Sequence, residues 1–294
     1  MDSGFAQRVE AQRERLATKP LREIEAAVAA KRVQWFEQRY AAGTRRTWGR
    51  RPAPRTAFDM FFFEYMGLRT DDLRVLRAND REIVWSSQNF CPTLEACNRL
   101  GLDTRVVCRH AYEKSTQAFV SLTDPALRFL RDYNQIRPQP TACQERIVRV
   151  DFEEMTQIAI QEAKQSQRSG NKGYGAVVAA GDQILARAHD TAVTEQDPSC
   201  HAEVNAIRAA VHTLGDSNLS GAVLFASCEP CPMCSSLAVW ANLSAMVFGA
   251  SIEKTAAQGR TRIQVAAREI VARSPVQMEI SPGVLEKECL ELYQ

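Results

Sequence analysis

The sequence has no long apolar run, and its first residues have no apolar core. No stretch of about 18 or more apolar residues occurs in the 294 residues, which argues against a membrane-spanning helix. The opening MDSGFAQRVEAQRERLATKP mixes acidic with basic side chains and resembles neither a secretory signal nor a transit peptide. Internal repeats and low-complexity tracts are also absent. We therefore expect a globular protein of the cytoplasm with no membrane partner.

Cysteine is abundant, with nine residues in the chain. Without a secretory signal, this number favours reduced thiols, some of them bound to metal. The first half contains Cys91, Cys97, Cys108 and Cys143, whose spacing fits no zinc template. We expect them to be buried structural thiols rather than a second metal site or a reactive-thiol site.

Charge is distributed unevenly between the two halves of the chain. Residues 1–150 contain 26 Lys and Arg against 18 Asp and Glu, whereas residues 151–294 contain 11 against 17. This asymmetry predicts two units: a basic, mainly helical domain over 1–148 of unknown role, and a second domain over 149–294. Five arginines surround Trp48 within residues 43–55 and could bind an anion or nucleic acid, although a solvated surface loop is the simpler interpretation.

The second half alternates helical and strand patterns. An amphipathic helix is expected over 151–167, with Asp151 as its N-terminal cap and Glu154 as the partner of that cap. Apolar strands are expected over 174–180, 183–188, 222–227 and 245–250, with Gly181 and Asp182 in a hairpin turn between the first two. Further helices are expected over 200–215, 233–241 and 283–293. This alternation predicts an α/β fold with helices on both faces of the sheet.

One group of residues has the composition of a metal site. Cys231 and Cys234 form a C-x-x-C pair at a helix entrance, where two thiolates can share one ion. His201 opens another predicted helix and is the obvious third ligand. Three such ligands leave zinc one open position for water, and Glu203, two residues on, can reach that water without being a ligand.

HAE followed by CEPCPMC resembles the H-x-E and P-C-x-x-C pattern of the cytidine and deoxycytidylate deaminase superfamily. Within it, the sequence is most similar to the branch of guanine deaminases and tRNA adenosine deaminases, over roughly residues 150–294. The resemblance implies a three-layer α-β-α domain, a zinc cofactor and a homodimer. It also implies hydrolytic deamination in which Glu203 moves the protons.

The resemblance also suggests three substrate contacts. Relatives carry an asparagine at the position of Asp190, and because an ionised aspartate only accepts hydrogen bonds, Asp190 should favour an N–H or O–H edge and repel phosphate. Trp240 falls where guanine-deaminase-like members also have tryptophan and could stack on a base, although a core position explains it equally well. Glu253 follows the fourth predicted strand and is a possible polar contact.

Several alternatives stay open. The zinc could be structural, with Cys200 or Cys228 as fourth ligand, but that interpretation leaves Glu203 unexplained. His212 lies eleven residues beyond His201, about 16 Å along a helix, which is too far to share the ion. A nucleobase, nucleoside or related amino-heterocycle is the expected substrate. The alternatives are adenosine in tRNA, with the basic domain binding RNA, and a non-catalytic interaction module stabilised by zinc.

Overall fold

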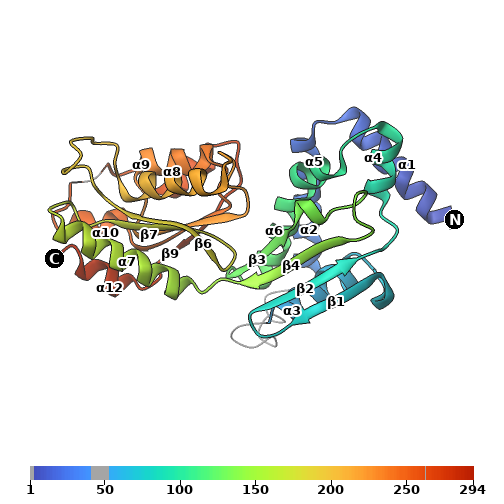
Figure 1. Ribbon diagram of the computed structural model, residues 1–294, viewed down its shortest axis with the longest axis horizontal. Coiled ribbons are helices and arrows are strands. Elements are labelled where there is room, and N and C mark those ends of the chain that lie inside the picture. The colour runs from blue at the N-terminus through green and yellow to red at the C-terminus, as the bar shows by residue number, and fades with distance from the viewer. Residues whose placement is uncertain (1–2, 41–52, 262) are drawn as a thin grey trace. The chain divides into compact units, whose positions relative to one another are not determined.

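The structure is a computed structural model that describes residues 3–40, 53–261 and 263–294 (Figure 1). It divides into two compact units, residues 1–150 and 151–294. Most of the basic segment 43–55, including Trp48, lies outside the described residues. Within the described ranges, no helix is both long and apolar enough to cross a membrane.

The N-terminal unit is mainly helical, as predicted. Its helices are α1 (Ser3–Thr18), α2 (Leu21–Arg39), α3 (Pro54–Phe58), α4 (Pro92–Leu100), α5 (Thr104–Cys108) and α6 (Lys114–Thr123), with π-helical turns at Asp59–Tyr65 and Arg109–Glu113 and 3₁₀ turns at Thr70–Asp72 and Tyr133–Gln135. Strands β1 (Leu73–Ala78), β2 (Glu82–Ser87), β3 (Leu127–Arg131) and β4 (Cys143–Arg149) form an antiparallel sheet in the order β1-β2-β4-β3. The sequence did not predict this sheet.

An aromatic core holds the N-terminal unit together. Trp85 of β2 is fully buried and packs edge-on against Phe58 and Phe62, with ring centroids 4.8 and 4.9 Å apart. The indole N–H of Trp85 donates to the Glu145 carboxylate at 3.2 Å, and Arg131 pairs with the same carboxylate at 2.6 Å. The polar groups of these three side chains therefore satisfy one another, as a packed core requires.

The N-terminal cysteines only partly match the expectation of buried thiols. Cys97 is buried, whereas Cys91, Cys108 and Cys143 are half-buried, so the expectation is wrong for these three. Cys91 is the cap residue of α4, and Cys143 begins β4 where Arg137 Nε donates to its sulfur at 3.4 Å. Cap and strand-end positions keep a side chain near solvent.

The C-terminal unit is a three-layer α-β-α domain. Its strands β5 (Gly175–Ala180), β6 (Gln183–His189), β7 (Ala222–Cys228), β8 (Ala245–Ala250) and β9 (Glu279–Pro282) have the order β6-β5-β7-β8-β9, antiparallel from β6 to β7 and parallel from β7 to β9. Its helices are α7 (Phe152–Arg168), α8 (Ala202–Leu214), α9 (Pro232–Trp240), α10 (Ile252–Ala257), α11 (Ala267–Ala272) and α12 (Glu286–Glu291).

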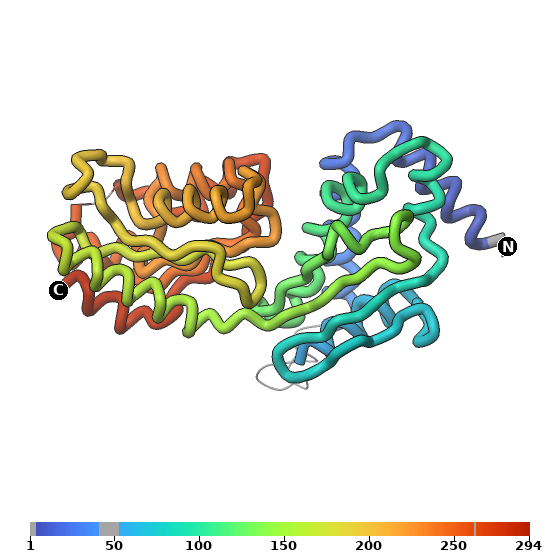
Figure 2. The backbone as a smooth tube through the Cα atoms, viewed as in Figure 1, coloured from blue at the N-terminus to red at the C-terminus, as the bar shows by residue number. Residues whose placement is uncertain are grey.

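The helices cover both faces of this sheet (Figures 1 and 2). Small side chains of α8 and α9, such as Ala206 and Ala238, pack with Val178 and Leu224 on one face. On the other face, α7 and α12 contribute Ile160, Ala163 and Cys289 to a second apolar cluster. The Asp151 cap and the hairpin turn between β5 and β6 are present as predicted. Strand β9 and helices α10 and α11 were not predicted.

Close approach of α7 to the sheet requires glycine at 175. A Cβ atom added there would lie 2.0 Å from the carbonyl oxygen of Ala159 and 2.4 Å from the amide nitrogen of Ala163. We predict that Gly175→Ala lowers the free energy of unfolding by about 2–3 kcal/mol, because the backbone of α7 must shift. Urea denaturation measures this. Gly215→Ala is the comparison: its site has open space and a φ of +67°, so it carries only a backbone penalty of about 1 kcal/mol. An equal decrease in the free energy of unfolding in the two variants would contradict the steric explanation.

Candidate active site

Two helix starts bring the predicted metal ligands together. Strand β7 ends at Cys228, and three residues later Cys231 is the cap residue of α9, with Pro232 in its first position. His201 is the cap residue of α8. Because proline has a fixed φ suited to the first helical turn, it sets the direction in which α9 leaves the cap. The backbone thus places Cys231, Cys234 and His201 at adjoining helix N-termini.

The three ligand atoms have the spacing that a tetrahedral zinc site requires. Sγ of Cys231 lies 3.6 Å from Sγ of Cys234, and Nδ1 of His201 lies 3.6 and 3.5 Å from these two sulfur atoms. Tetrahedral zinc with ordinary bond lengths would separate such atoms by about 3.6–3.8 Å. Among the described residues, this is the one group of three or more possible ligands within 4.8 Å of one another. The residues therefore fit zinc without rearrangement.

Electrostatics also favour a cation at this position. A hydrogen bond with Cys234 is the main cause that lowers the pKa of Cys231 to about 4, and burial opposes it. The pKa of Cys234 is raised, chiefly by its hydrogen bond with Cys231 and further by burial and by the negative charge of Glu203. The pKa of His201 is raised, chiefly by its hydrogen bond with Cys231. A divalent cation would relieve this crowding of negative charge.

Glu203 lies beside the metal ligands without belonging to their set. It is in the first turn of α8, its side chain is 7% exposed, and its Oε2 accepts a hydrogen bond from Cys234 Sγ at 3.5 Å. A carboxylate in the first turn is favoured by the helix dipole. Glu203 is thus a buried proton acceptor within reach of any water bound at the metal position.

The candidates for a fourth protein ligand point elsewhere. The Cys200 thiol donates to Glu195 at 3.4 Å, and Cys228 Sγ lies 3.8 Å from Thr255 Oγ1. His212 is exposed in the last turn of α8. None of these three joins the metal group within the part of the chain that the structure describes. This arrangement leaves the fourth position of a zinc ion open.

The three predicted substrate contacts have different positions. Asp190 directly follows β6 and is fully buried, and the N–H of the next residue, Thr191, donates at 3.0 Å to the carbonyl of Cys200, which precedes His201. Trp240 ends α9 and is 85% exposed; it follows Cys234 by six residues, about 9 Å along the helix axis. Glu253 is exposed on α10. The segment that carries Asp190 thus adjoins the one that carries His201, whereas Trp240 and Glu253 are exposed on α9 and α10.

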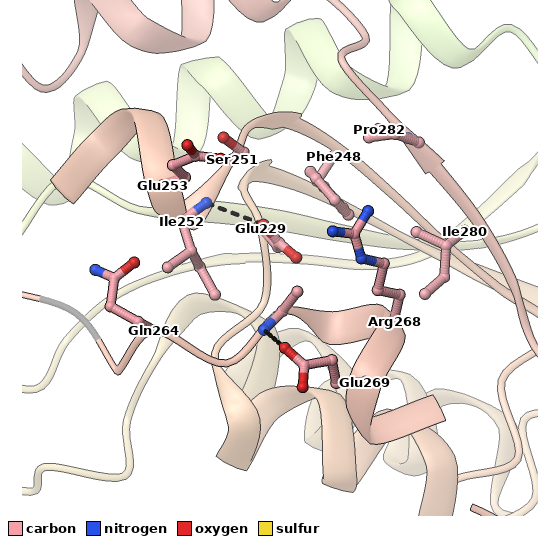
Figure 3. Close-up of a pocket in the computed structure, with 11 residues that line it drawn as sticks. Glu229, Phe248, Ser251, Ile252, Glu253, Gln264, Arg268, Glu269, Ile280 and Pro282 are labelled. Carbon is pink, nitrogen blue, oxygen red and sulfur yellow. Dashed lines mark hydrogen bonds between the residues drawn. The ribbon is translucent and has the colours of Figure 1, made fainter. Parts of the chain in front are cut away.

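Two supporting residues escaped the sequence interpretation. Both carboxylate oxygens of Glu229 accept backbone N–H bonds at 2.9 Å, from Ile252 and from Ala267, so Glu229 fixes the starts of α10 and α11. Figure 3 shows the bond from Ile252. Asn205 Nδ2 donates to the His189 carbonyl and to Thr191 Oγ1, each at 3.0 Å. Glu229 lies within the CEPCPMC motif, so the motif could have indicated that it has a role. No pattern in the sequence indicates the role of Asn205.

A separate cavity of about 470 Å³ adjoins Glu229 at the carboxyl ends of β7 and β8. Glu253, Arg268 and Phe248 are among the residues that line it, and Figure 3 shows the Arg268 side chain between Phe248 and Ile280. The metal ligands do not line it. Glu253 therefore faces this cavity rather than the metal group.

Comparison with known proteins gives consistent results. Residues 150–250 match the family model described as the cytidine and deoxycytidylate deaminase zinc-binding region. A tRNA-specific adenosine deaminase of Bacillus subtilis is 40% identical over 131 residues, which are 45% of this chain and 79% of that protein. The guanine deaminase of the same organism is 40% identical over 86 residues, 29% of this chain and 55% of that protein. A solved structure of Bacillus subtilis guanine deaminase shares 35% identity, covers 37% of this chain and 71% of its own, and has a TM-score of 0.36.

Proposed function

This chain belongs to the cytidine and deoxycytidylate deaminase family, and from that premise we propose that it is a zinc-dependent hydrolytic deaminase of a nucleobase, nucleoside or related amino-heterocycle. The observation that supports this most is the group of His201, Cys231 and Cys234, with sulfur and nitrogen atoms 3.5–3.6 Å apart and the buried Glu203 beside them. A structural site would use four protein ligands and would have no need of the carboxylate.

The roles of the residues follow from their positions. His201 Nδ1 and the two thiolates hold the metal. Zinc, when bound, supplies a Lewis acid that lowers the pKa of water in its open position to about 7. Glu203 would accept one proton of the attacking water and deliver it to a ring nitrogen. It would then take the remaining proton of the new C–OH group and give it to the amino group, so that the C–N bond breaks, ammonia leaves and a carbonyl remains. Because Glu203 is 7% exposed, bulk water does not compete strongly for its proton.

Adenosine in tRNA is the second candidate substrate. The chain covers 79% of one relative, the tRNA-specific adenosine deaminase of Bacillus subtilis, and residues 1–150 carry an excess of basic side chains. A basic surface supports binding to nucleic acid through phosphate contacts, which weaken steeply as salt rises. The C-terminal unit itself carries 11 basic against 17 acidic residues, which favours a small substrate.

We predict that the zinc-loaded protein releases ammonia from at least one small amino-heterocycle. The assay compares guanine, cytosine, adenine, their nucleosides, triazines and tRNA at equal zinc content and at two salt concentrations. Turnover of a base or nucleoside supports the main proposal. Turnover of tRNA alone, lost at high salt, supports the second candidate. A zinc-loaded protein that releases ammonia from none of them would contradict both and would favour a non-catalytic zinc module.

A further inference from the structure

The outer strands β8 and β9 form the floor of the cavity beside Glu229. Phe248 is opposite Pro282 in the parallel pair and Met246 is opposite Ile280, so all four side chains lie on one face of the sheet. Helix α11 packs on this face, where Ala267 joins the apolar cluster of Met246 and Ile280. Because α11 has only six residues, it covers part of the face, and the cavity of about 470 Å³ lies over the remainder.

The cavity has the size and the lining of a site for a small molecule. Ligand pockets usually enclose about 300–1,000 Å³ and combine apolar walls with a few polar groups that orient the ligand. Here Phe248 and Ile252, each 3% exposed, form the apolar wall together with Ile280 and Pro282. The charged side chains of the lining decide which ligand fits.

Two of the three carboxylates that line the cavity are engaged by the protein itself. Glu229 accepts one backbone N–H bond on each oxygen, at the starts of α10 and α11. Glu269 accepts the Ala266 N–H at 3.4 Å and pairs with Arg273 at 3.5 Å. The third, Glu253, is exposed to water. The negative charges of Glu229 and Glu269 are thus offset without the help of a ligand.

Arg268, on α11, is the one basic residue among the described residues that line the cavity. Its side chain lies between those of Phe248 and Ile280 (Figure 3), and the residue is exposed, so a ligand can reach it. Within the described ranges it forms no hydrogen bond or ion pair. A guanidinium presents parallel N–H donors that match the two oxygens of a carboxylate. Arg268 therefore offers an unoccupied carboxylate-binding group beside an apolar wall.

We propose that this cavity is a second ligand site, which binds a small organic carboxylate with a flat apolar body. The carboxylate pairs with Arg268, and the apolar body lies against Phe248 and Ile280. A doubly charged phosphate ester is disfavoured, because three carboxylates line the same cavity and repel a dianion more strongly than a monoanion. The metal ligands do not line the cavity, so this inference does not depend on the proposed function.

The experiment is a fluorine NMR titration of the zinc-loaded full chain with three probes of similar shape: 4-fluorobenzoate, the neutral 4-fluorobenzamide and the cationic 4-fluorobenzylamine. We expect the Kd of the benzoate to be at least about 10-fold lower than that of either other probe, the effect of a hydrogen bond to a charged group. Arg268→Gln should raise the Kd of the benzoate by at least about the same factor. Arg168→Gln is the matched control, an exposed arginine of α7 outside the cavity, and keeps the wild-type Kd.

The same titration after removal of zinc by a chelator separates this site from the metal group, and the Kd of the benzoate should stay unchanged. Four results would overturn the inference: no saturable binding of the benzoate, tighter binding of the benzylamine, an unchanged Kd in Arg268→Gln, or loss of binding together with zinc. The last result would make the cavity part of the reaction centre. All four leave the proposed deamination intact, and a chain without deaminase activity leaves this site intact.

Discussion

Glu203→Gln is expected to lower kcat for deamination by about 10²–10⁴-fold, the usual contribution of a positioned general acid–base group, and to leave zinc bound. Glutamine keeps the size of the side chain and its place in the first turn of α8, but it cannot accept a proton from water. Steady-state ammonia release measures the rate, and atomic emission measures zinc in the same sample.

Glu154→Gln is the matched control for this change. Glu154 is also in the first turn of a helix of the C-terminal unit, but it is exposed and lies on α7. We expect this variant to keep the wild-type kcat. If Glu203→Gln also kept the wild-type kcat with zinc bound, Glu203 would have no role in proton transfer.

Replacement of Cys231 or Cys234 by serine is expected to remove the zinc ion and with it the activity. Loss of one ligand should weaken zinc binding by at least about 100-fold. Mutation of a residue that only hydrogen-bonds to a metal ligand already lowers metal affinity by about 10–100-fold. The C-terminal unit has apolar clusters on both faces of its sheet, so it should stay folded. If zinc stands at 1,000 times its wild-type Kd, a complete loss of binding removes about 4 kcal/mol of stability, or roughly 10 °C in Tm, and a 100-fold loss of affinity removes about 2.7 kcal/mol. Zinc analysis and thermal unfolding test both effects, and a chelator should reproduce them in the wild-type chain.

Cys200→Ala and Cys228→Ala separate a catalytic from a structural site. The sulfur of Cys200 contacts Glu195 and that of Cys228 contacts Thr255, so neither variant should lose zinc. If one of these variants lost zinc, with a fall in Tm equal to that of Cys234→Ser, the replaced cysteine would be a fourth thiolate ligand. The site would then be closed, and the proposed mechanism would fail.

The sequence predicts this fold well wherever one pattern dominates. The apolar runs 222–227 and 245–250 become central strands because they are buried on both faces, and Asp151 and Gly215 mark helix ends through local hydrogen bonding and backbone conformation. The sheet of residues 1–150 was missed because strands such as β1 carry several charged and exposed positions. Strand β9 is short and depends on pairing with β8, which local sequence cannot reveal.

The same limit applies to the site. Residue types and spacing are sufficient to group His201, Cys231, Cys234 and Glu203, because each occupies a fixed place at a helix start. Whether Trp240 contacts the site depends instead on the direction in which the end of α9 faces, and in the structure this side chain is exposed. Glu229 and Asn205 form hydrogen bonds with backbone groups of segments distant in the sequence, and a local sequence pattern does not predict such contacts.

X-ray absorption at the zinc edge of the purified, zinc-loaded protein tests the central claim most directly. We predict that zinc is coordinated by two sulfur atoms near 2.3 Å, one imidazole nitrogen near 2.0–2.1 Å and one further light atom from solvent. We also predict that this coordination is unchanged in Cys200→Ala and Cys228→Ala. Coordination by three sulfur atoms, or no stoichiometric zinc at all, would contradict the claim.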